Sequence, residues 1–274
     1  KAITKNTKAI MPVDLGGLPV DYIALNSLLI KERVKSKFSP KTDFQRKIGR
    51  PIVISDAAHS IGSIINGLPT PLFSDFSIFS FHSVKNITTG EGGMVLTDDD
   101  ELASNCRSLR NLCFTSEKRF VHARMGWNFR MTNLQAAVGV AQLEQLPEFV
   151  VKKRFIGEIY SNLLSSIDSI QLPLAETDYA KNIYWVYGLL IDEDHDLDAN
   201  AAMAALGAKG IGTRPFFYPM HKQPVFKNMG LFAEEQHPNS ELMYSKGFYI
   251  PSGLGVTEAQ MSKVAEEICT IFSR

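Results

Sequence analysis

Apolar residues in the first half of the chain occur in short runs that turn residues or charges close. Residues 9–13 form one such run, and a Gly-rich loop follows it. The run at 51–56 is largely apolar and ends in Asp56, a pattern typical of a strand buried on both faces of a parallel sheet. Residues 75–82 alternate between two faces, and 94–97 are a short, mainly apolar run, so both segments are predicted strands.

Longer amphipathic stretches separate these runs and predict helices. Residues 22–34 are one, and 98–112 are another that begins on acidic residues. Thr132 has the character of an N-cap, and an apolar stripe continues from it to Leu163. Because Pro147 interrupts that stripe, we expect a long, kinked helix that leads into a second unit. Strands that alternate with helices predict an α/β fold.

The second half of the chain has fewer regular patterns. Residues 184–191 predict a strand, 201–206 a helix that ends at a glycine, and 257–272 a terminal amphipathic helix. We therefore expect a larger domain over residues 1–147 and a smaller α+β domain over 148–274.

Composition restricts the class of protein. Lys plus Arg and Asp plus Glu both number 29 in 274 residues, so no excess charge attracts nucleic acid or an acidic membrane surface. No apolar run approaches the ~20 residues of a membrane helix, and the first residues lack a signal-peptide pattern. Cys106, Cys113 and Cys269 are too scattered for a disulfide framework or a zinc site. A cytoplasmic protein without a bound metal is expected.

A basic stretch is the exception to this even balance. Residues 31–50 hold eight Lys or Arg and two acidic residues. A solvated surface insertion explains such a stretch, and a flap that attracts anions is the alternative.

Asp56 and Lys85 are the candidates for chemistry. An acid at the end of a buried strand needs a partner, which could be a backbone amide or a cationic ligand such as a protonated pyridine nitrogen. Lys85 follows the strand at 75–82 and precedes the turn Thr-Thr-Gly-Glu-Gly-Gly. It could lie on the surface, or it could be held near a cofactor as a nucleophilic amine.

Four segments resemble one family. Residues 56–60 (DAAHS) and 80–94 (SFHSVKNITTGEGGM) closely resemble the DegT/DnrJ/StrS-type nucleotide-sugar aminotransferases, which are pyridoxal 5'-phosphate (PLP) enzymes. Residues 126–137 (GWNFRMTNLQAA) are similar to a further motif of that family. The stretch 212–221 (GTRPFFYPMH) looks like its perosamine-synthase branch. The resemblance implies PLP fold type I, with a mostly parallel sheet flanked by helices.

The resemblance also implies roles for single residues. Lys85 would form the Schiff base with PLP and shuttle a proton, and Asp56 would pair with the pyridinium nitrogen. His59 would lie against the cofactor ring or its 3'-hydroxyl, and Ser80 would bind the phosphate. Asn128 would reach the phosphate of a neighbouring subunit, so a homodimer with shared sites is implied. Alternatively, Ser80 could merely fill an inward position of its strand, and Asn128 could form a turn.

The similarity to perosamine synthases suggests substrate contacts. Arg214, Tyr218 and His221 are the candidates, with ordinary loop positions as the alternative. Trp127 and Trp185 are interpreted as packing residues.

The predicted function follows from the resemblance. It is transfer of an amino group, from glutamate, to a nucleotide-linked 4-keto-6-deoxy sugar in cell-surface polysaccharide or related sugar biosynthesis. A PLP-dependent sugar 3-dehydratase is disfavoured, because that sister group has a histidine where this chain has Lys85. Chains of that family carry a further N-terminal segment with a phosphate-binding loop. We therefore expect the large domain of this chain to be N-terminally incomplete. A non-catalytic protein or an inactive fragment is a further alternative.

Overall fold

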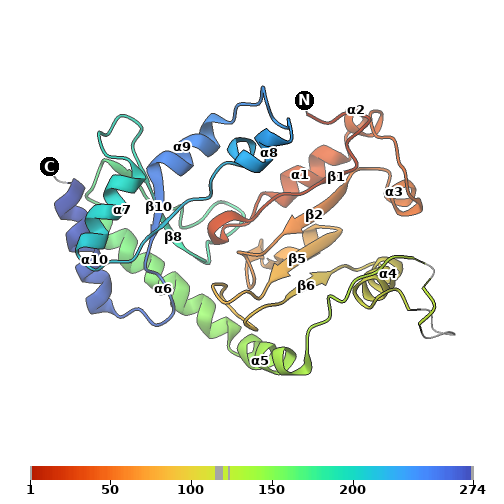
Figure 1. Ribbon diagram of the computed structural model, residues 1–274, viewed down its shortest axis with the longest axis horizontal. Helices are drawn as coiled ribbons and strands as arrows, with labels where there is room; N and C mark the ends of the chain where they lie inside the picture. The colour runs from red at the N-terminus through yellow and green to blue at the C-terminus, as the bar shows by residue number, and fades with distance from the viewer. Residues whose placement is uncertain (1, 115–119, 123, 273–274) are drawn as a thin grey trace. The chain divides into compact units, whose positions relative to one another are not determined.

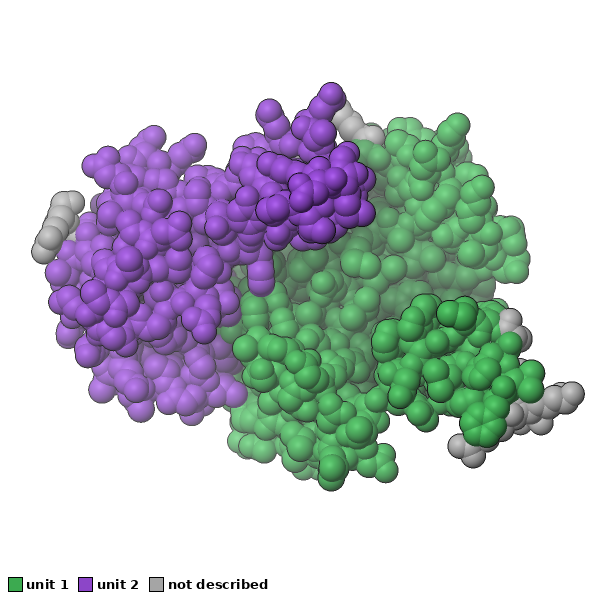
Figure 2. Space-filling view, viewed as in Figure 1, with its two compact units in different colours: residues 1–150, 176–185 green, residues 151–175, 186–274 purple. Residues whose placement is uncertain are grey.

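The computed structural model divides the chain into two compact units (Figure 2). Unit 1 consists of Lys1–Val150 and Glu176–Trp185, and unit 2 of Val151–Ala175 and Val186–Arg274. The expected domains at 1–147 and 148–274 did not include this return of the chain to unit 1. The structure describes residues 2–114, 120–122 and 124–272.

A four-stranded mixed sheet forms the centre of unit 1 (Figure 1). Its order is β1 (Ala9–Ile10), β2 (Ile52–Asp56), β5 (Phe76–Ser80) and β6 (Gly93–Leu96). The first two pairs are parallel, and β6 runs antiparallel to β5. No residue of β2 is exposed, as expected of a strand covered on both faces. The predicted α/β class, with a mostly parallel sheet, is confirmed.

The helix expected over residues 22–34 is wrong in extent, since two helices form instead. Tyr22 and Leu29 are seven residues apart, so they share one helix face, and both are fully buried with Val53 of β2. A continuing helix would point Val34 about 140° away from Leu29. A break at Lys31, whose backbone is extended, lets Val34 join the same core.

The remaining elements of unit 1 are short, apart from two helices. The helices are α1 (Tyr22–Leu29), α2 (Glu32–Lys35), α3 (Asp43–Ile48), α4 (Asp100–Arg110), α5 (Asn133–Glu144) and the 3-10 turns η1 (Leu15–Gly17) and η2 (Thr70–Phe73). A hairpin of β3 (Ile64–Ile65) and β4 (Leu68–Pro69), which the sequence patterns did not indicate, completes it.

The expected kinked helix is two consecutive helices. Thr132 caps α5 in a capping box with Gln135, as its sequence position predicted. α5 ends at Glu144 with Gln145 as its C-cap, and α6 (Leu146–Leu164) begins directly after that residue. Pro147 therefore lies in the first turn of a new helix, where its missing N–H leaves no hydrogen bond unmade.

Unit 2 is built on an antiparallel sheet. Its strands are, in order, β7 (Ile170–Gln171), β8 (Tyr187–Ile191), β10 (Gly247–Ile250) and β9 (Arg214–Pro215). The helices of this unit, besides α6, are α7 (Ala199–Ala208), η3 (Met220–Lys222), α8 (Pro224–Asn228), α9 (Pro238–Lys246) and α10 (Glu258–Phe272).

Two predictions for unit 2 can be compared with these bounds. The terminal helix is confirmed, and Thr257 Oγ1 caps it by accepting a hydrogen bond from the amide of Gln260 (3.3 Å). The strand expected from residue 184 begins only at Tyr187, because Tyr184 has a positive φ of 49° and Trp185 belongs to unit 1. Within the described ranges, none of the helices has both the length and the apolar character needed to cross a membrane.

Candidate active site

The site forms at one edge of the unit 1 sheet. Asp56 is the last residue of β2 and Ser80 the last of β5, and because these strands are parallel their ends lie at the same edge. The amide of Ala57 continues the pairing by donating to the carbonyl oxygen of Ile78 (2.9 Å). The loops that follow the two strands are therefore neighbours. Ligands of open α/β sheets bind at such carboxyl edges.

Asp56 has the backbone amide partner that its sequence position left open, and its pairing with a cationic ligand stays a prediction. It is half-buried, and its Oδ1 accepts a hydrogen bond from the amide of Ala58 (3.1 Å). Its negative charge also attracts the ammonium group of Lys85, an interaction strong enough to act on the pKa of that lysine. Asp56 and Lys85, 29 positions apart in the sequence, are thus brought into one electrostatic environment.

Lys85 is a half-buried amine held in a turn. Its amide donates to the carbonyl oxygen of His82 (2.9 Å), which closes the turn after β5. Burial lowers the pKa of Lys85 below its ordinary value, and the attraction of Asp56 opposes that change in part. A lowered pKa leaves more of the amine neutral near pH 7, which is the form that attacks a carbonyl.

His59 is a buried, neutral imidazole beside that amine. The ring is 9% exposed, and burial, followed by the positive charge of Lys85, lowers the pKa of His59 to about 3. Its Nδ1 accepts a hydrogen bond from the amide of Gly16 (3.4 Å). At neutral pH the proton of the imidazole is therefore on Nε2.

Trp185 belongs to this site, although the sequence favoured packing over a platform for a ring. Its indole stacks on the ring of His59, with centroids 3.5 Å apart and planes at 16°. The Nζ of Lys85 lies 4.2 Å from the centre of the indole. The aromatic run at 184–187 carries no local signal of this contact, because Lys85 and Trp185 are 100 positions apart in the chain.

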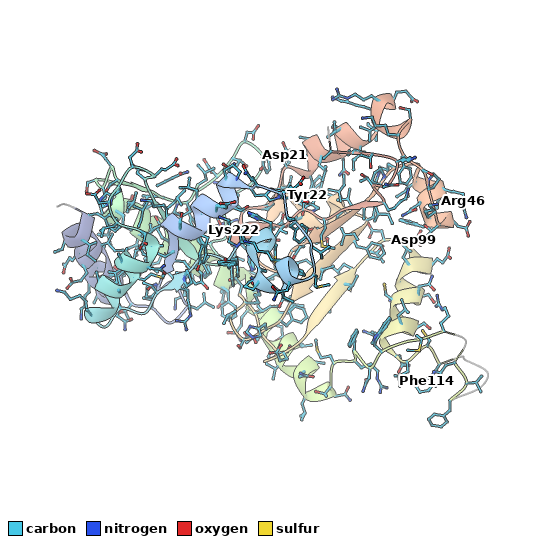
Figure 3. The ribbon with its side chains drawn as sticks, turned by 45° about the horizontal axis from the view of Figure 1, so that its top comes forward. Asp21, Tyr22, Arg46, Asp99, Phe114 and Lys222 are labelled. Carbon is cyan, nitrogen blue, oxygen red and sulfur yellow. The ribbon has the colours of Figure 1, made fainter. Side chains whose placement is uncertain are left out.

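A buried carboxylate supports the loop that carries His59. Asp14 has no exposed surface, and it accepts hydrogen bonds from the hydroxyls of Ser60 (2.6 Å) and Tyr22 (3.0 Å). Tyr22, labelled in Figure 3, is the first residue of α1. Burial raises the pKa of Asp14. Its amide donates to the carbonyl oxygen of Asp56 (3.0 Å), so Asp14 is tied to the end of β2 as well as to the loop of His59.

Ser80 and Asn128 lie in different surroundings. Ser80 is half-buried at the same sheet edge as Asp56, and its Oγ accepts a hydrogen bond from the amide of His82 (3.3 Å). Asn128 is exposed, and its side-chain oxygen accepts a hydrogen bond from Arg130 Nε (3.1 Å). Their expected roles toward a phosphate stay predictions.

The three expected substrate contacts all lie in unit 2. Arg214 is exposed in β9, and Tyr218 lines a pocket of about 570 Å³ while its ring meets that of Tyr244 edge-on. His221 is buried and lines a second pocket, of about 440 Å³.

A carboxylate on α9 connects these two pockets. Glu241 lines both, and it binds His221 Nε2 (2.8 Å) and the ammonium of Lys222. These hydrogen bonds lower the pKa of Glu241 to about 2. Lys222 is labelled in Figure 3. Both pockets therefore present the negative charge of Glu241 beside the ammonium of Lys222.

The unit 1 site combines the groups that a pyridoxal cofactor requires. Lys85 offers an amine whose pKa is lowered by burial, Asp56 offers a carboxylate, and His59 offers a flat, uncharged ring. An acid that protonates the pyridine and an amine that binds the aldehyde are the protein's share of PLP chemistry. An α/β unit with this arrangement of groups is typical of PLP-dependent transaminases.

Comparison with known proteins identifies the family. The chain belongs to the DegT/DnrJ/EryC1/StrS aminotransferase family, whose model matches residues 46–269. The class expected from the Lys85 motif, a PLP-dependent aminotransferase, is thereby confirmed.

Curated relatives agree with the expected branch. A GDP-perosamine synthase of Vibrio cholerae is 32% identical over 100% of this chain and 69% of its own length. A GDP-perosamine synthase of Escherichia coli O157:H7 is 34% identical over 99% of this chain and 67% of its own length. The predicted resemblance to perosamine synthases is confirmed.

Solved structures agree on the fold. Spr1654 from Streptococcus pneumoniae, in its PLP form, superposes with a TM-score of 0.91 at 24% identity, covering 99% of this chain and 70% of Spr1654. The predicted fold class is therefore confirmed.

Proposed function

We propose that this protein transfers an amino group from glutamate to a nucleotide-linked 4-keto-6-deoxy sugar, with PLP as its cofactor. One observation carries the proposal. The half-buried amine of Lys85, whose pKa is lowered by burial, lies within the electrostatic reach of Asp56 at the carboxyl edge of the sheet. When bound, PLP supplies an aldehyde and an electron-withdrawing pyridine ring.

In this proposal Lys85 has two tasks. Its neutral amine would hold the aldehyde of the cofactor, and the same amine, when free, would take and return a proton at the substrate carbon. Both tasks need an amine that gives and takes a proton near pH 7. Burial in this site moves the pKa of Lys85 in that direction.

Asp56 and His59 would bind and orient the ring. The carboxylate of Asp56 would keep the pyridine nitrogen protonated, while its bond from the amide of Ala58 fixes the orientation of the carboxylate. His59 would lie against the ring or its 3'-hydroxyl as a neutral imidazole, so it adds no positive charge beside the pyridinium. Ser80, at the same edge, would bind the phosphate.

The sugar substrate is proposed from the relatives and from unit 2. Two relatives that align with nearly all of this chain are GDP-perosamine synthases, which supports a nucleotide-linked sugar substrate. Arg214, Tyr218 and His221 are the candidate contacts.

We further propose a cytoplasmic homodimer in which the exposed Asn128 reaches the partner's phosphate site. We also propose a role in polysaccharide biosynthesis.

Spectral titration and product analysis test the function. The full-length protein with PLP should show a visible absorption band that glutamate bleaches and a 4-keto-6-deoxy nucleotide sugar restores. Mass spectrometry should then find an amine in place of the keto oxygen. A product that has lost a hydroxyl instead would identify a 3-dehydratase, and absence of PLP binding would identify a non-catalytic protein. Either result overturns the proposal.

A further inference from the structure

Trp185 has three contacts around Lys85 and has no part in the function proposed so far. Its side chain is buried, with 7% of the residue exposed. The indole stacks on His59 at 3.5 Å, and its Nε1–H donates to the carbonyl oxygen of Val84 (2.9 Å). The same ring system lies 4.2 Å from Lys85 Nζ. One side chain thus contacts the amine of Lys85 and the peptide bond that precedes it.

These contacts restrict the indole in two independent ways. Stacking on His59 fixes the plane of the ring, and the directional bond to Val84 fixes its rotation within that plane. The backbone is fixed as well, because a Cβ on Gly17 would come within 2.7 Å of the Trp185 amide nitrogen. The face that Lys85 meets is therefore held rigidly.

We propose that Trp185 is a positioning residue for Lys85. Its Nε1–H holds the backbone at Val84, and its ring face attracts the amino group by a cation–π contact while that group is charged. Lys85 thereby returns to one place each time that its covalent bond to the cofactor is broken. The proposal rests on the proposed function, in which Lys85 binds PLP.

Two variants separate the contacts of Trp185. Trp185→Phe keeps an aromatic face and loses the Nε1–H donor, whereas Trp185→Leu loses both. Phe38→Leu is the matched control, because Phe38 also lies under a lysine of unit 1, with Lys8 Nζ 5.8 Å from its ring centre. Thermal unfolding of each variant shows whether it is folded.

Two measurements on the full-length protein test the role. The first is the rate at which the covalent adduct with PLP forms, followed by its visible band. The second is the dissociation constant of pyridoxamine 5'-phosphate, which binds without a bond to lysine. We expect Trp185→Leu to slow adduct formation about tenfold and Trp185→Phe about threefold, since small displacements of a reacting group have large effects on rate. Pyridoxamine phosphate should bind all variants within about twofold of wild type, and Phe38→Leu should change neither quantity.

Three outcomes would overturn the proposal. An unchanged rate of adduct formation in the folded Trp185 variants contradicts it directly. If Trp185→Leu does not fold, the rate of Trp185→Phe alone decides. If the rate of adduct formation and the affinity for pyridoxamine phosphate fall equally, Trp185 lines the cofactor pocket and does not position Lys85. Absence of any adduct in the wild-type protein contradicts the proposed function, and the role of Trp185 fails with it.

Discussion

At the scale of single residues, the site depends on one amine whose surroundings change its pKa. The motif around Lys85, and Asp56 at the end of an apolar run, could be recognised in the sequence because each is a local pattern. Trp185 and Asp14 could not, since their contacts join positions far apart in the chain. Local patterns predict which residues carry chemistry, while the residues that support them depend on the fold.

His59 provides the prediction at this scale. Its pKa of about 3 in the folded protein lies below the ordinary value near 6.5. Between these values the unfolded chain binds a proton that the folded chain does not, so stability falls as pH decreases. From pH 7 to pH 5 this amounts to about 2 kcal/mol.

Urea unfolding at pH 7 and pH 5 measures the effect. His59→Gln, which cannot titrate, should lose about 2 kcal/mol less than the wild-type protein over this interval. The NMR signals of His59 should also stay those of a neutral ring down to about pH 4. If wild type and variant show the same pH dependence, the imidazole is charged in the folded protein.

At the scale of elements, the sequence predicted what a continuous pattern encodes. The buried strand β2, the cap of α5 and the terminal helix α10 were expected and are present. β9 and β10 were missed, because they are defined by pairing with each other and with β8, which joins segments more than 30 positions apart in the chain. The break between α1 and α2 was missed because it depends on the shared core with β2.

The capping box of α5 gives a prediction for an element. Thr132 Oγ1 accepts from the amide of Gln135 (3.2 Å), and the Gln135 side chain accepts from the amide of Thr132 (3.0 Å). Thr132→Ala should lower the free energy of unfolding by about 1 kcal/mol, which corresponds to about 3 °C in thermal unfolding. Thr132→Ser, which keeps the acceptor, should change the midpoint by less than about 1 °C. Equal losses in both variants would contradict a contribution from the cap.

At the scale of the whole molecule, the chain crosses between two units more than once. It enters unit 2 at Val151, returns to unit 1 over Glu176–Trp185, and leaves again. The returning segment is held by the amide of Ile183, which donates to the carbonyl oxygen of Gly17 (3.1 Å). No local pattern marks this return, because the residues that hold the segment, such as Gly17, His59 and Val84, lie 100 or more positions earlier in the chain.

Gly17 tests how the returning segment is held. Its φ of +108° disfavours a side chain, and an added Cβ would meet the amide nitrogens of Trp185 (2.7 Å) and Tyr184 (3.0 Å). Gly17→Ala should therefore destabilise unit 1 by more than about 2 kcal/mol. Hydrogen exchange at residues 183–185 should accelerate at least about tenfold, while the amides of the unit 2 sheet keep their protection.

Gly16 is the matched control for this substitution. It also has a positive φ, +72°, but an added Cβ would meet no atom within 4 Å. Gly16→Ala should cost only about 1 kcal/mol of backbone strain and leave exchange at 183–185 near the wild-type rate. Faster exchange in both variants alike would mean that strain, and not the contact with the returning segment, determines the effect.

The central claim is that Lys85 carries the cofactor, and peptide mapping tests it most directly. The full-length protein is loaded with PLP, reduced with borohydride and digested, and the modified lysine is located by mass spectrometry. The account predicts the added mass on Lys85 and its absence in Lys85→Arg. A protein that binds PLP but is modified at another lysine, or an arginine variant that is still modified at wild-type level, would contradict the account.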